Sequence, residues 1–307
     1  MTVFLQTLAS GLTLGSVYAL IALGFTFIFA STHVVNFAQG DWAMIVGMIA
    51  ATVVASSLGI FWAAVIAPIA GAAIGFLAYR IFFGFARSMD TMTISLVLLG
   101  ASLFLEGFAV LIWGPDPRGI SQLATLPPIK LAGAVLPLTS VIVLTATVAL
   151  LLIVVFFLTL TKAGRATIAV AQNREAAALC GIDVTRVIMI SFVLSGIFAG
   201  IAGGLITPIT SMYYQGGVTL TFKGFAAAAI GGLRNTTGAV VGGFALGLME
   251  AFAASYIGRG TAGQEIGLVL PLMVLIAIGP RLQASGTRSE EAAETFTADV
   301  AADAANL

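Results

Sequence analysis

Residues 4–30 read FLQTLASGLTLGSVYALIALGFTFIFA, a stretch without a single charged side chain. A helix needs about 20 mostly apolar residues to cross the hydrocarbon core of a membrane, so this stretch is long enough for one span. It is too long for the apolar region of a secretory signal peptide, and no basic residues precede it. The stretch therefore predicts a membrane helix that stays in the mature protein.

The composition of the whole chain agrees with this prediction. Of its 307 residues, 60% are hydrophobic and 8% are charged, whereas soluble domains carry about 25% charged residues. Such a chain requires lipid rather than water around most of its surface. The 13 basic and 13 acidic residues cancel, so the net charge indicates no nucleic-acid partner, and membrane lipid is the expected surrounding.

Further apolar stretches predict more membrane segments. Residues 218–233 are too few and too rich in glycine for an ordinary span, so we interpret them as a broken or re-entrant helix. We therefore expect an all-α, polytopic membrane helix bundle of about eight or nine membrane segments. The other spans are expected at 42–79, which holds two with a break near Ser56 to Gly59, and at 91–113, 137–160, 187–222, 238–257 and 264–280.

Glycine spacing predicts how these helices pack. Pairs four residues apart occur at Gly11 and Gly15, Gly71 and Gly75, and Gly243 and Gly247. Small residues at this spacing let helix backbones approach closely within a membrane. The pairs indicate a multi-helix bundle rather than a particular function.

Basic residues predict the orientation of the loops, because Lys and Arg are enriched on the cytoplasmic side. They occur in the loops 161–187 and 80–90, which two spans separate, so both loops are expected in the cytoplasm. The loop 114–136 is then expected outside, as an extended cap. The membrane domain is expected at 1–284, followed by a polar, acidic tail at 285–307 whose composition is typical of disorder.

The sequence lacks common catalytic and nucleotide-binding patterns. It contains no GxxxxGK[ST], HExxH or GxSxG motif. With one cysteine, Cys180, and one histidine, His33, it has neither an intrachain disulfide nor a cluster of these metal ligands. We therefore expect no catalytic residue, no metal site and no cofactor bound by this chain.

Two interrupted segments, one in each half of the chain, predict a substrate path. They read VVNFAQGDWAM at 34–44 and TFKGFAAAAIGGLRNTTG at 221–238. Paired discontinuities indicate the binding region of a transporter, because lipid tolerates irregular backbone only where protein or water satisfies it. The alternative is that each is an ordinary loop. A charge at the membrane centre costs at least ~2.5 kcal/mol, so Glu106 is expected to line a cavity. Glu250 is expected either to line a cavity as well or to lie near the membrane boundary.

The cytoplasmic loop 161–187 predicts a short docking helix. Asn173 is a suitable N-cap, Glu175 lies in the first turn, and Gly181 is suited to end the helix. Its small apolar surface with charged edges fits a groove on a cytoplasmic partner. The alternative is a loop lying on lipid headgroups, which the scarcity of basic and large aromatic residues disfavours.

Three motifs in order resemble one known family, the LivH-type permease subunits of bacterial ABC importers for branched-chain amino acids. The motifs are GLTLGSVYALIALGFTFIF at 11–29 with VVNFAQGDW at 34–42, the loop GRATIAVAQNREAAALCGIDVTRV at 164–187, and FKGFAAAAIGGLRNTTGAVVGGFALGLMEA at 222–251. The resemblance implies a multi-pass permease of the bacterial cytoplasmic (inner) membrane, with no enzyme activity of its own.

The resemblance also implies partners and site residues. The partners are a second, LivM-like permease, an extracytoplasmic substrate-binding protein and two ATPase subunits, which hold the ATP and Mg. The implied residues of the substrate path are Asn36, Gln39, Asp41, Glu106, Phe222, Lys223 and Phe225, and those of the ATPase contact are Asn173, Arg174, Glu175, Ala176, Leu179 and Gly181.

Departures from the family pattern leave the solute open. Gln39 stands where the family usually has His, Asp41 where it has Glu, and Glu106 where an amide is common, while residues 234–237 replace its usual turn. Urea, short amides and aromatic acids, which related permeases carry, are alternatives to branched-chain amino acids. A stand-alone channel or ion-coupled transporter is the alternative function, although it would not need the capped helix at 173–181. A membrane enzyme is disfavoured by the missing catalytic motifs.

Overall fold

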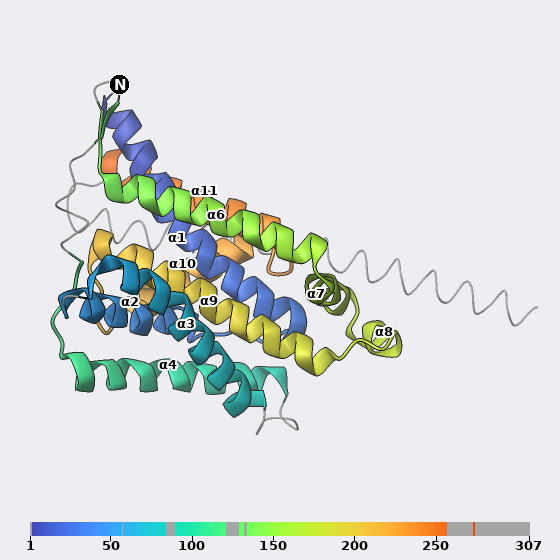
Figure 1. Ribbon diagram of the computed structural model, residues 1–307. Helices are drawn as coiled ribbons and strands as arrows, with labels where there is room; N and C mark the ends of the chain where they lie inside the picture. The colour runs from blue at the N-terminus through green and yellow to red at the C-terminus, as the bar shows by residue number, and fades with distance from the viewer. Residues whose placement is uncertain are drawn as a thin grey trace, which may run out of the picture.

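Figure 1 shows the computed structural model, which describes residues 2–56, 58–83, 90–120, 129–131, 134–256 and 273. The fold is an almost entirely helical bundle, which confirms the predicted fold class. Two predicted segments lie outside the described residues. They are the span at 264–280, of which only residue 273 is described, and the tail at 285–307.

The helix boundaries agree closely with the predicted spans. The break predicted near Ser56 falls between two helices, and the segment predicted as broken or re-entrant forms one helix too short to cross a membrane. The membrane helices are α1 (Thr2–Thr32), α2 (Gln39–Ala55), α3 (Gly59–Ala78, continued by the π-helical turn η1 at Tyr79–Phe83), α4 (Thr91–Trp113), α6 (Leu138–Leu160), α9 (Val184–Thr210), α10 (Gly216–Gly231) and α11 (Thr236–Tyr256).

Six of the described helices are long and apolar enough to span a membrane, namely α1, α3, α4, α6, α9 and α11. In the apolar 18-residue stretch that marks each span, 83% of the residues of α1 are buried within the protein, whereas the share is 22% for α3 and α4 and 17% for α6. Because a lipid-facing helix has few protein contacts, α1 forms the centre of the bundle and α6 its periphery. The helices α2 and α10 are only about half as long as α1.

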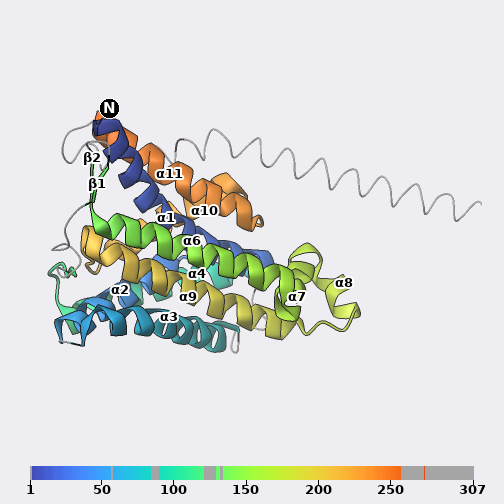
Figure 2. The same ribbon diagram turned by 45° about the horizontal axis from the view of Figure 1, so that its top comes forward.

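The two ends of the bundle differ in structure. At one end, β1 (Ile129–Leu131) and β2 (Ala134–Leu136) pair antiparallel next to the N-terminus (Figure 2). There Arg118 also pairs with Met212 through two backbone hydrogen bonds. At the other end, α7 (Lys162–Gln172) and α8 (Arg174–Leu179) project beyond the bundle (Figure 1). The positive-inside rule predicts that this α7–α8 end is cytoplasmic.

The described helices include two similar triplets. A long helix, a sharp corner, a half-length helix and a second long helix follow one another in α1–α2–α3 and again in α9–α10–α11. The triplets pack on each other reciprocally, with α1 along α11 and α9 along α3, while α2 packs on α9 and α10 on α1. Since α1 runs toward the α7–α8 end and α9 runs away from it (Figure 1), the triplets have opposite orientations, as inverted repeats of transporters do.

Glycines bring the reciprocal helix pairs close together. A Cβ on Gly71 of α3 would lie 2.1 Å from the carbonyl oxygen of Gly196 in α9. A Cβ on Gly247 of α11 would lie 2.2 Å from the backbone nitrogen of Gly15 in α1. The predicted packing role of the glycine pairs is thereby confirmed.

Candidate functional site

The two half-length helices start inside the bundle because the chain turns back on itself after each preceding long helix. His33 follows α1 with a φ angle of 59°, and Ser211 follows α9 with a φ angle of 55°. Non-glycine residues seldom adopt this left-handed conformation, and they concentrate at turns and functional sites. The returning segments place the first residues of α2 and α10 among the long helices.

The first turns of α2 and α10 cross each other in direct backbone contact. A Cβ on Gly40 would lie 2.1 Å from the carbonyl oxygen of Gly217, and one on Gly217 would lie 2.1 Å from Oδ1 of Asp41. The backbone N–H of Gly40 donates a hydrogen bond to Oγ1 of Thr221 over 2.9 Å, and that hydroxyl donates to the carbonyl oxygen of Phe37 over 3.2 Å. The partially positive ends of two helices therefore meet at this crossing.

A buried amide and hydroxyl network lies beside the crossing. Nδ2 of Asn36 donates to Oε1 of Gln39 over 2.9 Å, and Nε2 of Gln39 donates to the carbonyl oxygen of Ser195 over 3.1 Å. The Ser195 hydroxyl donates back to Oε1 of Gln39 over 2.7 Å. All three side chains are completely buried. A saturated network of this kind fixes the corner between α1 and α2 against α9.

Asp41 is the buried carboxylate at the crossing. The Ser102 hydroxyl of α4 donates to its Oδ2 over 2.5 Å. Among the described residues, no hydrogen-bond donor contacts Oδ1 of Asp41. The same holds for Oε1 of Glu106, a residue about one turn after Ser102 on α4. Two acidic oxygens on neighbouring helices are thus available to a donor from outside the described residues. Asn36, Gln39, Asp41 and Glu106 therefore all lie at or beside the crossing.

The residues predicted on the second half-helix occupy different surroundings. Phe225 lies near the crossing, where its ring centroid is 6.4 Å from that of Phe37 and 5.8 Å from that of Phe25 in α1. Phe222 is 46% exposed on the outside of the bundle. The structure therefore brings Phe225 to the polar corner and leaves Phe222 on the surface of the described chain.

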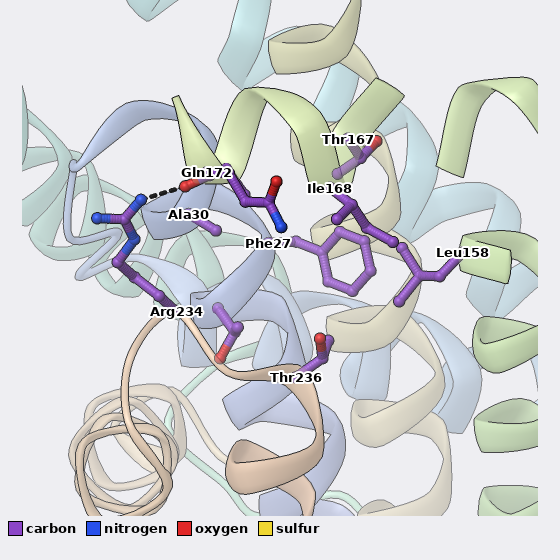
Figure 3. Close-up of a pocket in the computed structure, with 10 residues that line it drawn as sticks. Phe27, Ala30, Leu158, Thr167, Ile168, Gln172, Arg234 and Thr236 are labelled. Atoms are coloured by element: carbon purple, nitrogen blue, oxygen red, sulfur yellow. Dashed lines mark hydrogen bonds between the residues drawn. The ribbon is translucent and has the colours of Figure 1, made fainter. Parts of the chain in front are cut away.

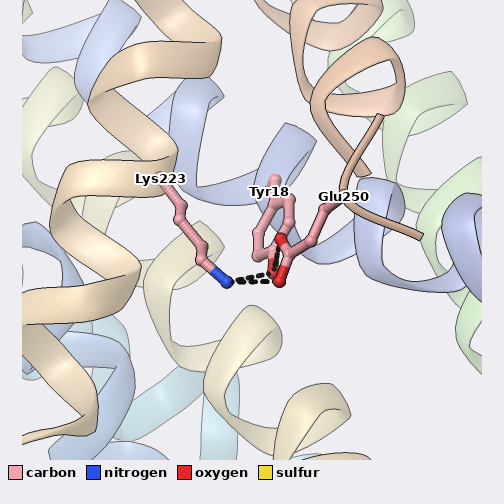
Figure 4. A network of polar contacts seen from close by, with 3 residues as sticks. All are labelled: Tyr18, Lys223 and Glu250. Atoms are coloured by element: carbon pink, nitrogen blue, oxygen red, sulfur yellow. Dashed lines mark hydrogen bonds and ion pairs between the residues drawn. The ribbon is translucent and has the colours of Figure 1, made fainter. Parts of the chain in front are cut away.

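Lys223 forms a separate polar triad with residues of α1 and α11 (Figure 4). Its Nζ lies 2.6 Å from Oε1 of Glu250 and donates to the hydroxyl of Tyr18 over 3.0 Å. Tyr18 in turn donates to Oε2 of Glu250 over 2.8 Å. Thr221 and Lys223 point to different sides of α10, since residues two apart on a helix differ by about 200°. The triad binds α1, α10 and α11 together, on another side of α10 from the crossing.

The predicted docking helix is present as α8, and its predicted cap is confirmed. Oδ1 of Asn173 accepts a hydrogen bond from the backbone N–H of Ala176 over 2.9 Å, and Gly181 ends the turn with a φ angle of 81°. Glu175 lies in the first turn, where a negative charge stabilises the helix dipole. The helix α7, which precedes α8 and follows the capping residue Thr161, was not expected from the sequence.

One face of α8 is held against the protein while the other remains free in the described chain. Ala177 is buried against Val170 of α7 and Val187 of α9. Leu179 is 90% exposed. Arg174, Glu175 and Ala176 are also exposed. An anchored helix with an exposed leucine and charged neighbours fits the predicted docking role, which stays a prediction.

Sequence reasoning missed several residues of the crossing. Ser102, Ser195 and Thr221 lie within apolar helices, where a hydroxyl usually bonds to the carbonyl four residues earlier and gives no sign of a long-range partner. Their roles follow from which helices meet, and a single sequence does not contain that information directly.

Comparison with known proteins provides a separate result. Residues 7–279 match the family model for the permease component of branched-chain amino acid transport systems. The high-affinity branched-chain amino acid transport system permease protein LivH of Escherichia coli K12 is 30% identical over 275 residues, which cover 83% of this chain and 87% of that protein. The corresponding protein BraD of Pseudomonas aeruginosa is 29% identical over 269 residues, covering 83% and 88%. A probable branched-chain amino acid permease of Methanocaldococcus jannaschii is 30% identical, covering 84% of each chain. No solved structure matches the chain.

Proposed function

Because the chain belongs to the family of permease components of branched-chain amino acid transport systems, we propose that its helix crossing forms the solute path of an ATP-driven importer. The chain is a permease subunit and a multi-pass protein of the inner membrane, and six helices in its described part are long and apolar enough to span that membrane. The solute that we propose is a branched-chain amino acid or a related small polar molecule, as the names of its relatives indicate.

The observation that carries this proposal is the crossing of α2 and α10. Two half-length helices with opposite orientations start at one point inside the bundle, where Gly40 contacts Gly217. Transporters commonly bind solutes where discontinuous helices meet, because their free N–H groups and carbonyls are available there. The buried oxygens of Asp41 and Glu106 supply acceptors beside those helix ends.

We further propose that ATP is bound and hydrolysed by two separate ATPase subunits, with Mg, and that no cofactor binds to this chain. α8 supports this arrangement, since it presents Leu179 and charged residues at the predicted cytoplasmic end. A second, LivM-like permease and an extracytoplasmic binding protein complete the proposed importer. In it, closure of the ATPases moves α8, and that motion reaches the bundle through α7 and α9.

Uptake by the reconstituted complex tests the proposed function. The chain, copurified with its partners, is placed in liposomes with ATP on the α8 side and the binding protein on the other side. Labelled leucine, isoleucine and valine are compared with urea, a short amide and an aromatic acid. We expect accumulation of one of these solute classes with ATP and none with a non-hydrolysable analogue. Equal uptake without ATP would instead identify a channel or an ion-coupled transporter.

A further inference from the structure

A cavity of about 200 Å³ opens at the α7–α8 end of the bundle, apart from the helix crossing. Figure 3 shows side chains from the end of α1, the end of α6, α7 and the start of α11 around it. None of its residues belongs to the polar network at the crossing. The lining residues are Thr26, Phe27, Ala30, Leu158, Thr167, Ile168, Ala171, Gln172, Arg234 and Thr236.

The lining divides into an apolar wall and a polar rim. Phe27, Leu158 and Ile168 supply the wall, and Ile168 is 40% exposed, so that the wall continues onto the outer surface of the bundle. Gln172 and Arg234 lie together on the other side (Figure 3). An amphiphilic molecule fits this arrangement, because its apolar part can contact the apolar wall while its polar part binds the rim. A small soluble ion would leave the apolar wall without a partner.

The polar rim favours an anion. The Arg234 guanidinium donates one hydrogen bond to the carbonyl oxygen of Ala171, and an arginine has five N–H donors. α11 begins at Thr236, which lines the cavity, so the partially positive end of α11 lies beside it, with the N–H of Gly238 already bonded to Oδ1 of Asn235. A phosphate group accepts hydrogen bonds from an arginine and from such a helix end.

The surroundings of the cavity are also electropositive. Burial lowers the pKa of His33, and the charges of Arg234 and Arg174 lower it further, so both arginines lie near His33 at this end of the bundle. The cavity lies where α1 and α6 end, at the boundary that the positive-inside rule places at the cytoplasmic leaflet. Anionic lipid headgroups concentrate in that leaflet.

We propose that this cavity is a binding site for a phospholipid with an anionic headgroup. The phosphate lies against Arg234, Gln172 and the start of α11, and an acyl chain follows Phe27, Leu158 and Ile168 out along α6. The bound lipid joins the α10–α11 turn to α7, which precedes the docking helix α8. The site is independent of the solute that the permease carries.

Native mass spectrometry of the copurified complex tests the proposal. Equal amounts of phosphatidylglycerol and phosphatidylcholine are added, and the lipids retained on this chain are counted. We expect a clear preference for phosphatidylglycerol, which Arg234→Ala reduces about fivefold, corresponding to ~1 kcal/mol per basic residue at a membrane surface. Ile168→Asp, at the exposed edge of the cavity, is expected to reduce it as well by repelling the headgroup. Arg186→Ala is the matched control, because Arg186 is exposed at the same end and pairs with Asp183.

Three results would overturn the proposal. They are equal retention of the two lipids by the unchanged chain, an unchanged preference in both Arg234→Ala and Ile168→Asp, and complete displacement of phosphatidylglycerol by millimolar inorganic phosphate. The last result would assign the cavity to a soluble anion. Since the readout is lipid retention, it does not depend on whether the proposed solute path is correct.

Discussion

Asp41 combines complete burial with an oxygen that no described donor contacts. A buried polar atom without a partner costs about 1–3 kcal/mol, and more for a charged group. A protein retains such a group where a ligand or a proton satisfies it during function. The position of Asp41 at two helix ends therefore points to a role in transport rather than in folding.

We predict that Asp41→Asn impairs uptake at least tenfold and leaves insertion in the membrane unchanged. The substitution keeps the shape and the acceptor for Ser102 but removes the negative charge. Initial uptake rates in the reconstituted complex measure the effect, with Ser102→Ala as the control that removes only the hydroxyl donor. Wild-type uptake rates in Asp41→Asn would show that the charge of this carboxylate is not needed in the solute path.

We predict that Gly217→Ala destabilises the protein, because the added methyl group overlaps Oδ1 of Asp41. Overpacking of this kind typically costs 1–3 kcal/mol. Gly107→Ala in α4 is the matched control, since a Cβ there meets no atom within 4 Å and alanine favours the helix by about 1 kcal/mol. Thermal unfolding in detergent should show a lower Tm for the first variant alone. Equal Tm values would contradict the observed closeness of α2 and α10.

The triad of Lys223, Glu250 and Tyr18 makes a prediction that separates stability from transport. Removing one partner of a fully buried ion pair costs about 3–5 kcal/mol, and a smaller cost is expected here because both side chains are 12% exposed, whereas replacing both partners is often tolerated. We therefore expect Lys223→Met and Glu250→Gln each to lower the Tm, and the double variant to recover most of the stability and the uptake. A stable double variant without uptake would show that Lys223 or Glu250 acts in transport, and would support the predicted place of Lys223 in the solute path.

At the scale of the helices, apolar stretches predicted the fold well. The span predicted at 91–113 coincides with α4, and the predicted break near Ser56 separates α2 from α3. The half length of α2 was missed, because residues 42–79 are uniformly apolar and read as two full spans. The short helix α10 was anticipated from the length and the glycine content of residues 218–233. Helix length within lipid is thus readable only where polar residues interrupt the apolar pattern.

The candidate site was predictable only in part for the same reason. Asn36, Gln39 and Asp41 are conspicuous as polar residues between apolar stretches. Their partners Ser195 and Thr221 are small hydroxyl residues that apolar helices tolerate anywhere. The placement of Lys223 beside Glu250 depends on which helices are neighbours, and no local pattern contains that information.

At the same scale, α8 allows a test of docking. We predict that Leu179→Asp weakens the association with the ATPase subunits, since it places a charge on an apolar side chain at the proposed interface, where a hot-spot residue contributes about 2 kcal/mol or more. The substitution should cost little stability, because Leu179 is 90% exposed. Leu58→Asp is the matched control, as Leu58 is 55% exposed at the start of α3, at the opposite end of the bundle. Copurified ATPase per permease is the readout, and equal recovery in both variants would rule out docking through Leu179.

The whole molecule is organised around two triplets of opposite orientation whose half-length helices meet at Gly40 and Gly217. Tilting one triplet against the other would open the crossing first to one end and then to the other, as in transporters with inverted repeats. α1 and α9 would carry this motion, because each is buried in the centre and packs on the other. The α7–α8 end continues directly into α9, so the proposed ATPase subunits would act on the bundle there.

The central claim, that this chain is one subunit of an ATP-driven importer, is tested most directly by identifying what accompanies it. The tagged chain is purified in mild detergent from its native membrane, and its companions are identified and counted by mass spectrometry. The account predicts two ATPase subunits and a second permease. Recovery of the chain alone, from a preparation in which other ABC complexes remain intact, would contradict the account and favour a channel or an ion-coupled transporter.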